Sequence, residues 1–271
     1  MTNRYIETIL STLDEKKEDI INQWQHPKNT HTKHFIVDNL IDKEVCLEIY
    51  KKAKINEELF IKQKSLKSKK SNANNVDLFD KPLKELVFAF QDQRVIMKIS
   101  DLLGLINLEP DPLLYAAGVS AMKKGDFLNP HLDNSHDVKR ERYRRLNLLF
   151  YITPEWSLKN GGNFELWDEK ISRPMTIESK FNRLLVMNTD TSSYHSVNKV
   201  LINKTRFCVS NYYYSKDSPN GKNYKHITSF YGRPKERLLN IISPIDNLLR
   251  NLSLKLFNFG RGKKQLYKKD K

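Results

Sequence analysis

The sequence of 271 residues lacks the features of several common protein classes. It contains only two cysteines, Cys46 and Cys208, which excludes a disulfide-rich scaffold and any cysteine-rich zinc module. No segment approaches the about 18 uninterrupted apolar residues of a membrane-spanning helix. The first 20 residues contain acids and no continuous apolar core, unlike a secretory signal peptide. We therefore expect a soluble protein of a reducing compartment, the cytoplasm, without a transmembrane segment.

Positive charge is in excess, because 47 Lys and Arg stand against 32 Asp and Glu, a formal net charge of +15. Such a charge favours contact with nucleic acid or a membrane surface, or is simply a lysine-rich solvated surface. Hydrophobic residues make up 39% of the chain, which can fill a core and excludes a wholly disordered protein. The length allows one large domain or two small ones.

Helical periodicity dominates the N-terminal part. Apolar residues recur at helical spacing from residue 4 to residue 24, and His26-Pro27 ends that helix. Asp42 is a suitable N-cap for a helix that reaches about residue 54. Pro82 suits the first turn of one further helix, which the spacing extends toward Leu103.

Residues 62–75 (KQKSLKSKKSNANN) interrupt this helical pattern. They contain five lysines, no acid and few apolar residues. We expect a mobile loop here, with a polyanion contact as the alternative.

The pattern changes after Pro110 to short β-type runs separated by turn residues. This spacing predicts a closed or two-sheet β architecture with the N-terminal helices packed outside it. A further apolar-periodic helix runs from Leu238 to Leu256 and precedes a basic end. It either docks on the β core, which we favour, or lies on a membrane. The β-type runs are LLYAAGVSAM, RLNLLFYI, GGNFELWD, RLLVMNT and RFCVSNYYYS.

The strongest chemical motif is His131-Leu132-Asp133, which follows a loop-like segment. In a strand, residues i and i+2 point to one face about 7 Å apart, so an imidazole and a carboxylate converge. They supply two members of a facial triad of two histidines and one carboxylate, the set that binds Fe(II) with open coordination positions. An isolated motif of this kind also arises by chance at a protein surface.

A third ligand must come from elsewhere in the chain. His195 follows the predicted strand at RLLVMNT and a turn, where the chain re-enters the sheet. His136 is a local alternative because it is close to Asp133, and a purely structural role for His195 is the other.

Arg206 follows His195 by eleven positions and begins the run RFCVSN. Period 2 places it on one face with Cys208 and Ser210, which are small. A guanidinium with space beside it suits a bidentate contact with a small carboxylate, whereas a solvent-directed arginine at a strand end is the alternative.

Together these segments, GDFLNPHLD, RLNLLFYITPEW, GGNFELWD, RLLVMNT, SSYHS and TRFCVSNYYYS, resemble the 2-oxoglutarate/Fe(II) oxygenases of the prolyl-4-hydroxylase-like type. The resemblance covers residues 113–215. It implies an α+β protein with a double-stranded β-helix (jelly roll) core and flanking N- and C-terminal helices. We expect one oxygenase domain over 1–271, with helical support at 1–110, the core at 111–216 and a helical, basic extension at 217–271.

The resemblance implies that His131, Asp133 and His195 bind iron. It implies that Arg206 and Tyr151 contact the distal carboxylate of 2-oxoglutarate, with O2 as the second cosubstrate. The implied reaction hydroxylates an unactivated C–H bond and releases succinate and CO2. The intact Asp133 favours hydroxylation over halogenation. The substrate is unassigned among a peptidyl residue, a small molecule and a glycan.

Two positions depart from the family pattern. Met122 stands where the family often has a tyrosine that contacts the cosubstrate, so this contact is absent or comes from Tyr115. Cys208 stands where a serine is usual. The pair Gly161-Gly162 matches the turn that opens the next strand.

Several other groups have both a structural and a functional interpretation. Residues 139–145 (KRERYRR) form either the rim of the substrate mouth or a solvated loop. Residues 212–214 (YYY) complete a strand, with base stacking as the alternative. No spacing selects an acid–base pair among Asp111, Glu165 and Asp168.

Two other functions compete with a hydroxylase. A nucleic-acid demethylase of the same superfamily would need a second arginine just beyond Arg206, and residues 209–215 contain none. A binding module without turnover would not need intact metal and carboxylate positions. The charge gathers at 62–70, at 139–145 and at the C-terminus, so we expect Arg206 to be the single inward cation and nucleic acid not to be the partner. Membrane contact through the basic C-terminus and the oligomeric state stay open.

Overall fold

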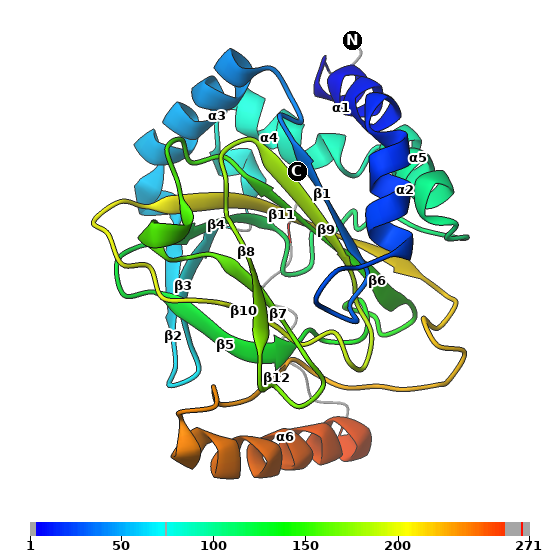
Figure 1. The fold of residues 1–271 in the computed structure, drawn as a ribbon, viewed down its shortest axis with the longest axis vertical. Coiled ribbons are helices and arrows are strands. Elements are labelled where there is room, and N and C mark those ends of the chain that lie inside the picture. Colours follow the sequence, from blue (N-terminus) through cyan, green and yellow to red (C-terminus); the bar gives the residue numbers. More distant parts are fainter. Residues whose placement is uncertain (1–3, 74, 258–266, 268–271) are drawn as a thin grey trace.

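The computed structural model describes residues 4–73, 75–257 and 267 (Figure 1). Its centre is a curled antiparallel sheet with the strand order β1-β9-β6-β11-β4-β3-β5-β10-β7-β8, to which β2 adds at β3 and β12 at β5. The α+β double-stranded β-helix expected from the sequence is therefore confirmed. The strands are β1 (His34–Asp38), β2 (Ile61–Lys64), β3 (Ser68–Ala73), β4 (Gly118–Met122), β5 (Phe127–Leu132), β6 (Tyr143–Tyr151), β7 (Phe164–Trp167), β8 (Pro174–Ile177), β9 (Arg183–Asn188), β10 (His195–Val197), β11 (Arg206–Ser215) and β12 (Ser229–Phe230).

The sheet has two parts that face each other across the interior. One part holds β1, β9, β6, β11 and β4, and the other holds β5, β10, β7 and β8. Strand β3 joins the two parts, because its first residues pair with β5 and its last residues pair with β4. All five β-type runs predicted from the sequence contain a strand of this sheet.

Alternation along the central strands creates two separate cores. On β11, Phe207 and Val209 belong to a large cluster with the N-terminal helices, whereas Cys208 belongs to a smaller cluster inside the curled sheet. On β9, Val186 and Met187 divide in the same way. Because successive side chains of a strand point to opposite faces, one face carries the stabilising helical layer and the other lines the interior.

Five helices form that outer layer over β1, β9, β6 and β11 (Figure 1). They are α1 (Arg4–Glu15), α2 (Lys17–Gln25), α3 (Lys43–Ile55), α4 (Lys81–Ala89) and α5 (Gln93–Leu103), and short 3₁₀ helices occupy Glu57–Leu59, Val76–Leu78 and Leu158–Asn160. Asp42 caps α3 as predicted, because its Oδ1 accepts hydrogen bonds from the N–H groups of Glu44 and Val45.

Two helices predicted as continuous are interrupted. The backbone leaves helical geometry at Lys16, which separates α1 from α2. The predicted helix from Pro82 to Leu103 is two helices, since the Asp92 side chain accepts a hydrogen bond from the N–H of Arg94 and caps α5 as a new helix. Apolar periodicity continues across both breaks, so it could not locate them.

The lysine-rich segment at residues 62–75 is not the loop that we predicted. It contains most of a β2–β3 hairpin, and β3 completes the hydrogen bonding between β4 and β5. Neighbouring strand edges thus decide the structure of a segment whose own composition favours a loop.

The C-terminal helix α6 (Arg237–Phe257) lies across the lower end of the molecule (Figure 1). It docks on the β core through polar groups. Asn247 Nδ2 donates to the carbonyl of Phe230 on β12, and Asn251 Oδ1 accepts from the N–H of Ile227. Docking is therefore confirmed. Within the described residues, no helix has both the length and the apolar content needed to cross a membrane.

The sheet also recruits strands from the first 110 residues, namely β1, β2 and β3. The division into support, core and extension at residues 110 and 216 stays a prediction.

The α3 cap provides a test of the helical layer. We expect Asp42→Ala to lower the free energy of unfolding by about 1 kcal/mol, because two helix N–H groups lose their acceptor. Urea denaturation measures this change. Asp42→Asn keeps an acceptor and should retain most of the stability, and equal stability of the alanine variant and the wild type would contradict the assignment.

Candidate metal centre and cosubstrate cavity

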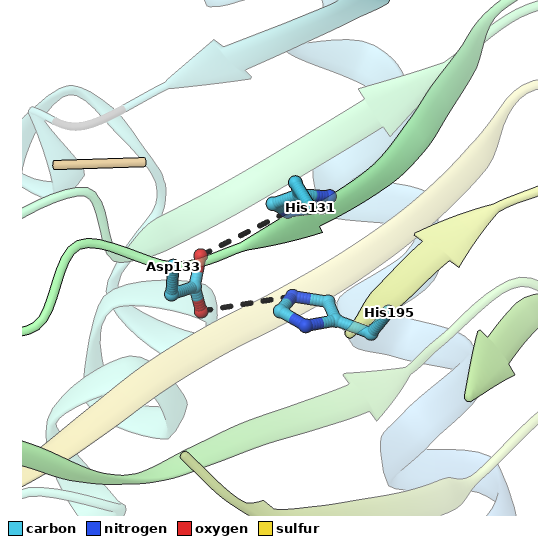
Figure 2. Close-up of side chains that lie close together, drawn as sticks. All are labelled: His131, Asp133 and His195. Carbon is cyan, nitrogen blue, oxygen red and sulfur yellow. Dashed lines mark ion pairs between the residues drawn. The ribbon is translucent and has the colours of Figure 1, made fainter. Parts of the chain in front are cut away.

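Two histidines and one aspartate converge inside the curled sheet (Figure 2). His131 on β5 and His195 on β10 are directly paired in the antiparallel register, and Asp133 follows the end of β5. One potential ligand atom from each residue lies within 4.8 Å of the others. The structure thus brings together the triad predicted from the sequence.

Both imidazoles are oriented by backbone carbonyls. Nδ1 of His131 lies 2.9 Å from the carbonyl oxygen of Asn129, and Nδ1 of His195 lies 3.0 Å from that of Ser193. A proton on each Nδ1 satisfies these contacts, which leaves each Nε2 with a lone pair toward Asp133. Those Nε2 atoms lie 3.8 Å and 3.7 Å from the carboxylate oxygens of Asp133.

Electrostatics keep these donors in the state that a metal requires. Burial lowers the pKa of His131 to about 3, and His195 beside it adds to this effect. Burial alone would raise the pKa of Asp133, but Arg144 and the two histidines hold it below its usual range. The cluster therefore combines an ionised carboxylate with a neutral His131, and these are the forms that bind cations.

Asp133 is held by two side chains of β6. Arg144 Nη1 lies 3.2 Å from Asp133 Oδ2, and Asn147 Nδ2 donates to the same oxygen over 3.3 Å. The Arg144 guanidinium is only 1% exposed and lies over the ring of Tyr212 at 3.7 Å. The carboxylate is thus fixed by β6, through the same oxygen that faces His195.

This position of Arg144 corrects the prediction that residues 139–145 form a rim or a solvated loop. Tyr143, Arg144 and Arg145 are buried members of β6, and only the preceding part of the segment lies before the strand. A β-bulge explains the inward turn, because Tyr214 pairs with Arg144 while Tyr213 pairs with Leu146. The bulge shifts the alternation by one residue.

Arg206 begins β11 and is 4% exposed. Its Nη1 donates to the carbonyl of Gly162 at 2.7 Å, and its Nη2 lies 3.2 Å from Met122 Sδ. Its Nε has no hydrogen-bond partner, and no carboxylate forms an ion pair with it within the described part of the chain. A buried cation without an anion is costly, so the site favours an anionic ligand.

Tyr151 complements this guanidinium. The Arg206 Cζ lies 5.3 Å from the centre of the Tyr151 ring, and the buried Tyr151 hydroxyl has no hydrogen-bond partner among the described residues. Burial raises the pKa of Tyr151, so its O–H is a donor at neutral pH. A free N–H and a free O–H are therefore available for one carboxylate.

A glycine turn shapes this end of the cavity. Gly161 and Gly162 both have positive φ, at 68° and 66°, and they precede β7 as the sequence predicted. A Cβ on Gly162 would lie 2.9 Å from Val200 Cγ2 and 3.5 Å from Arg206 Cδ. The positive φ and this close approach both favour glycine at the turn. The carbonyl of Gly162 accepts the hydrogen bond that fixes Arg206.

One cavity connects the triad with Arg206 and Tyr151. Cys208 and Ser210 also line it, which confirms that period 2 places them on one face with Arg206. The cavity lining does not include Tyr115, which we had considered as a replacement for the missing contact at Met122.

Lys70 also lines this cavity, and sequence analysis missed it. It lies on β3, in the segment predicted as a loop. No local signal in the lysine-rich segment distinguishes it from its neighbours, because its inward direction follows from the pairing of β3 between two distant strands. Its presence corrects the expectation that Arg206 is the single inward cation.

The remaining candidates do not join the site. His136 contacts Ser135 and Tyr143 and is not part of the triad. Glu165 forms an ion pair with Arg233, and Asp168 closes a turn through Ser172.

Two further groups are structural. Asp111 accepts from the N–H of Tyr115. The tyrosines at 212–214 are buried in β11, as their strand interpretation predicted.

The donor set fits a divalent transition metal. Two imidazole nitrogens and one carboxylate on one side of an ion leave the other positions for exogenous ligands, which is the arrangement of non-haem Fe(II) oxygenases. The unpartnered donors of Arg206 and Tyr151 in the same cavity suit the second carboxylate of a small dicarboxylic acid that also reaches the metal.

Comparisons with known proteins agree with this geometry. Residues 117–214 match the model of the 2OG-Fe(II) oxygenase superfamily. No curated protein matches the sequence. Among solved structures, a Pseudomonas putida prolyl-4-hydroxylase aligns with a TM-score of 0.56 at 12% identity, over 73% of this chain and 98% of that chain.

Two further solved structures share the fold. A prolyl 4-hydroxylase from Phytophthora capsici aligns with a TM-score of 0.55 at 15% identity, over 95% of this chain and 81% of that chain. A Trichoplax adhaerens prolyl hydroxylase in complex with a hypoxia-inducible factor peptide gives 0.52 at 15% identity, over 76% of this chain and 92% of that chain. The chain therefore contains a segment similar to the 2OG-Fe(II) oxygenase superfamily and shares its fold with prolyl 4-hydroxylases.

Proposed function

We propose that this protein is an Fe(II)- and 2-oxoglutarate-dependent hydroxylase in which His131, Asp133 and His195 hold the iron. The observation that carries the proposal is the shared cavity. It joins a metal-binding triad to Arg206, a buried guanidinium with no carboxylate partner in the described part of the chain. A metal site alone would not need that cation.

The chain's residues have distinct tasks in this proposal. Arg206 and Tyr151 bind and orient the distal carboxylate of 2-oxoglutarate through the free N–H and O–H described above. The backbone carbonyls of Asn129 and Ser193 fix the two imidazoles. Iron, when bound, supplies the oxidising chemistry with O2, releasing succinate and CO2 while a C–H bond is hydroxylated.

The substrate class stays open. The aligned structures are prolyl hydroxylases, one with a bound peptide fragment, and they support a peptidyl residue as the first candidate. A small molecule or a glycan is the alternative. A screen for succinate formation with peptides, free amino acids and saccharides, with a methylated oligonucleotide included, separates these classes from a demethylase.

Substitution of a triad residue and substitution of Arg206 should impair different binding steps. We expect His131→Ala to abolish tight Fe(II) binding and to lower succinate formation more than 100-fold, because one of three protein ligands is lost. We expect Arg206→Met to retain the metal but to weaken 2-oxoglutarate binding about 100-fold, since a buried charge-assisted contact disappears. Metal analysis and calorimetric titration measure the two effects.

Lys204→Met is the matched control, because Lys204 lies two positions before Arg206 and contacts Pro154 and Glu155 outside the cavity. It should leave both measurements unchanged. Full 2-oxoglutarate binding in Arg206→Met, or full metal binding in His131→Ala, would refute the assignment.

Arg144 is expected to act through Asp133. We expect Arg144→Met to weaken metal binding about 10- to 100-fold, because the ligand carboxylate loses the partner that orients it. Titration with Mn(II), followed by electron paramagnetic resonance, measures the affinity. Arg142→Met is the control, since Arg142 pairs with Asp137 and Glu109 instead. Equal metal affinity in the two variants would show that Arg144 only stabilises the fold.

We also propose that α6 contacts an anionic membrane surface. Its polar side is held against the β core by Asn247, Asn251 and an ion pair of 2.7 Å between Asp246 and Lys67. The opposite side is aliphatic, with seven side chains between 43% and 75% exposed: Leu238, Ile241, Ile242, Ile245, Leu248, Leu249 and Leu252. These positions recur every three or four residues and form one stripe.

The charge of this region favours a membrane, rather than a second copy of the chain, as the surface that covers the aliphatic side of α6. The sequence from Arg237 to Lys271 holds nine Lys or Arg and only two Asp, Asp246 and Asp270. Two copies of such a segment repel each other, whereas anionic lipid attracts it. Aliphatic side chains beside basic residues are the composition of helices that lie in a membrane interface. The cytoplasmic location predicted from the sequence would present the anionic leaflet.

Vesicle flotation tests this contact. We expect the protein to bind vesicles of phosphatidylcholine with phosphatidylglycerol and not vesicles of phosphatidylcholine alone. The triple variant Ile241→Ser, Ile245→Ser, Leu248→Ser should lose more than tenfold in binding, because three apolar side chains no longer enter the interface.

The matched control is the pair Ile106→Ser and Leu201→Ser, which removes exposed aliphatic side chains elsewhere. Absence of binding to the anionic vesicles overturns the proposal. A dimer in light scattering that the triple variant abolishes would overturn it in favour of a second copy.

A further inference from the structure

Lys70 differs from Lys67 and Lys69, its neighbours in the β2–β3 hairpin. Lys67 forms an ion pair with Asp246, and Lys69 forms one of 3.3 Å with Asp126. Lys70 lines the cavity beside the triad and Arg206, and it makes no hydrogen bond or ion pair within the described residues. Lys70 is thus a lysine that lines the cavity and has no anionic partner within the described residues.

The strand register fixes the place of Lys70. On β3, Ser71 pairs with Ala121 of β4, and Lys69 pairs with Phe127 of β5. Lys70 therefore occurs where β3 passes from one neighbour to the other, next in register to Met122. Met122 contacts Arg206 through its sulfur, a weak acceptor that offers no donor to a ligand. Lys70 supplies the donor that this position of β4 lacks.

The charges around the cavity are unbalanced. The cationic groups are Lys70, Arg144 and Arg206, and the carboxylate among them is Asp133, which Arg144 already contacts. Lys70 shares this cavity with Asp133 at the metal end and with Arg206 at the other end, and both charges act on its ammonium group. Arg206 and Lys70 are thus two positive charges beyond the Asp133–Arg144 pair, and neither forms an ion pair with a carboxylate of the described residues.

We infer that Lys70 is a second cationic contact for 2-oxoglutarate, beside Arg206. This inference rests on the proposed function, since it assigns a further residue to the same ligand. The carboxylates of 2-oxoglutarate supply the anion that a partly buried ammonium needs. Lys70 therefore contributes to the affinity for the cosubstrate and comes from a strand outside the segment that matches the family model.

The test is calorimetric titration of the Mn(II)-loaded full-length protein with 2-oxoglutarate, which measures binding without turnover. We expect Lys70→Met to raise the Kd about 10- to 100-fold, because a charge-assisted contact is lost. Lys70→Arg retains the charge and should lose less. Lys64→Met is the matched control, since Lys64 is an exposed lysine of the same hairpin, and it should keep the wild-type Kd.

The variants separate failure of this inference from failure of the proposed function. If Lys70→Met binds 2-oxoglutarate within twofold of the wild type while Arg206→Met does not bind it, the role of Lys70 is refuted and the function stands. If the wild type itself does not bind 2-oxoglutarate, both are refuted. Thermal unfolding and Mn(II) affinity are recorded for each variant, and Lys70→Gln replaces Lys70→Met if the latter unfolds at a lower temperature.

Discussion

The pairing of β5 with β10 is the constraint on which the site depends. It places His131 directly opposite His195, so two side chains 64 positions apart in the sequence become neighbours whose ring centres are 4.2 Å apart. Opposed residues of an antiparallel pair share a face. The carboxylate of Asp133 then needs only the next turn of the chain to complete three donors. A slip of one residue in this register would send His195 to the other face and remove the site.

Burial makes the same site electrostatically demanding. A buried charge needs a partner, and among the charged groups that line the cavity the described residues supply an ion-pair partner from outside it only to Asp133, through Arg144. Arg206 and Lys70 are left for a ligand. This imbalance costs stability in the free protein, and a bound dianion relieves it. The same charges therefore lower the stability of the free protein and favour ligand binding. A bound dianion also explains why the Tyr151 hydroxyl is buried without a hydrogen-bond partner among the described residues, although an unpaired buried O–H costs stability.

The parts of the site that the sequence predicted are those encoded by local spacing. His131, Asp133, His195 and Arg206 lie in strands or strand ends whose alternation and turns are visible in one segment. Arg144 was misassigned because a β-bulge at β6 shifts the alternation by one residue, and apolar patterns do not record a bulge. Lys70 was missed for a different reason. Its segment looks like a loop, and its strand exists because two distant edges, β4 and β5, both lack a neighbour without it.

The β2–β3 hairpin connects the interior with the proposed membrane surface. Lys70 enters the cavity from β3, while Lys67, three residues earlier, fixes Asp246 of α6. The helix itself keeps its polar residues for the β core and turns its aliphatic stripe outward, which reverses the usual arrangement of a docked helix. Such a reversal is stable only if those polar contacts outweigh the exposed apolar surface, or if another apolar phase covers the stripe. The contacts to the core are a few hydrogen bonds and one partly exposed ion pair, and each makes a small net contribution to stability. Cover by another apolar phase is therefore the stronger explanation for the aliphatic stripe.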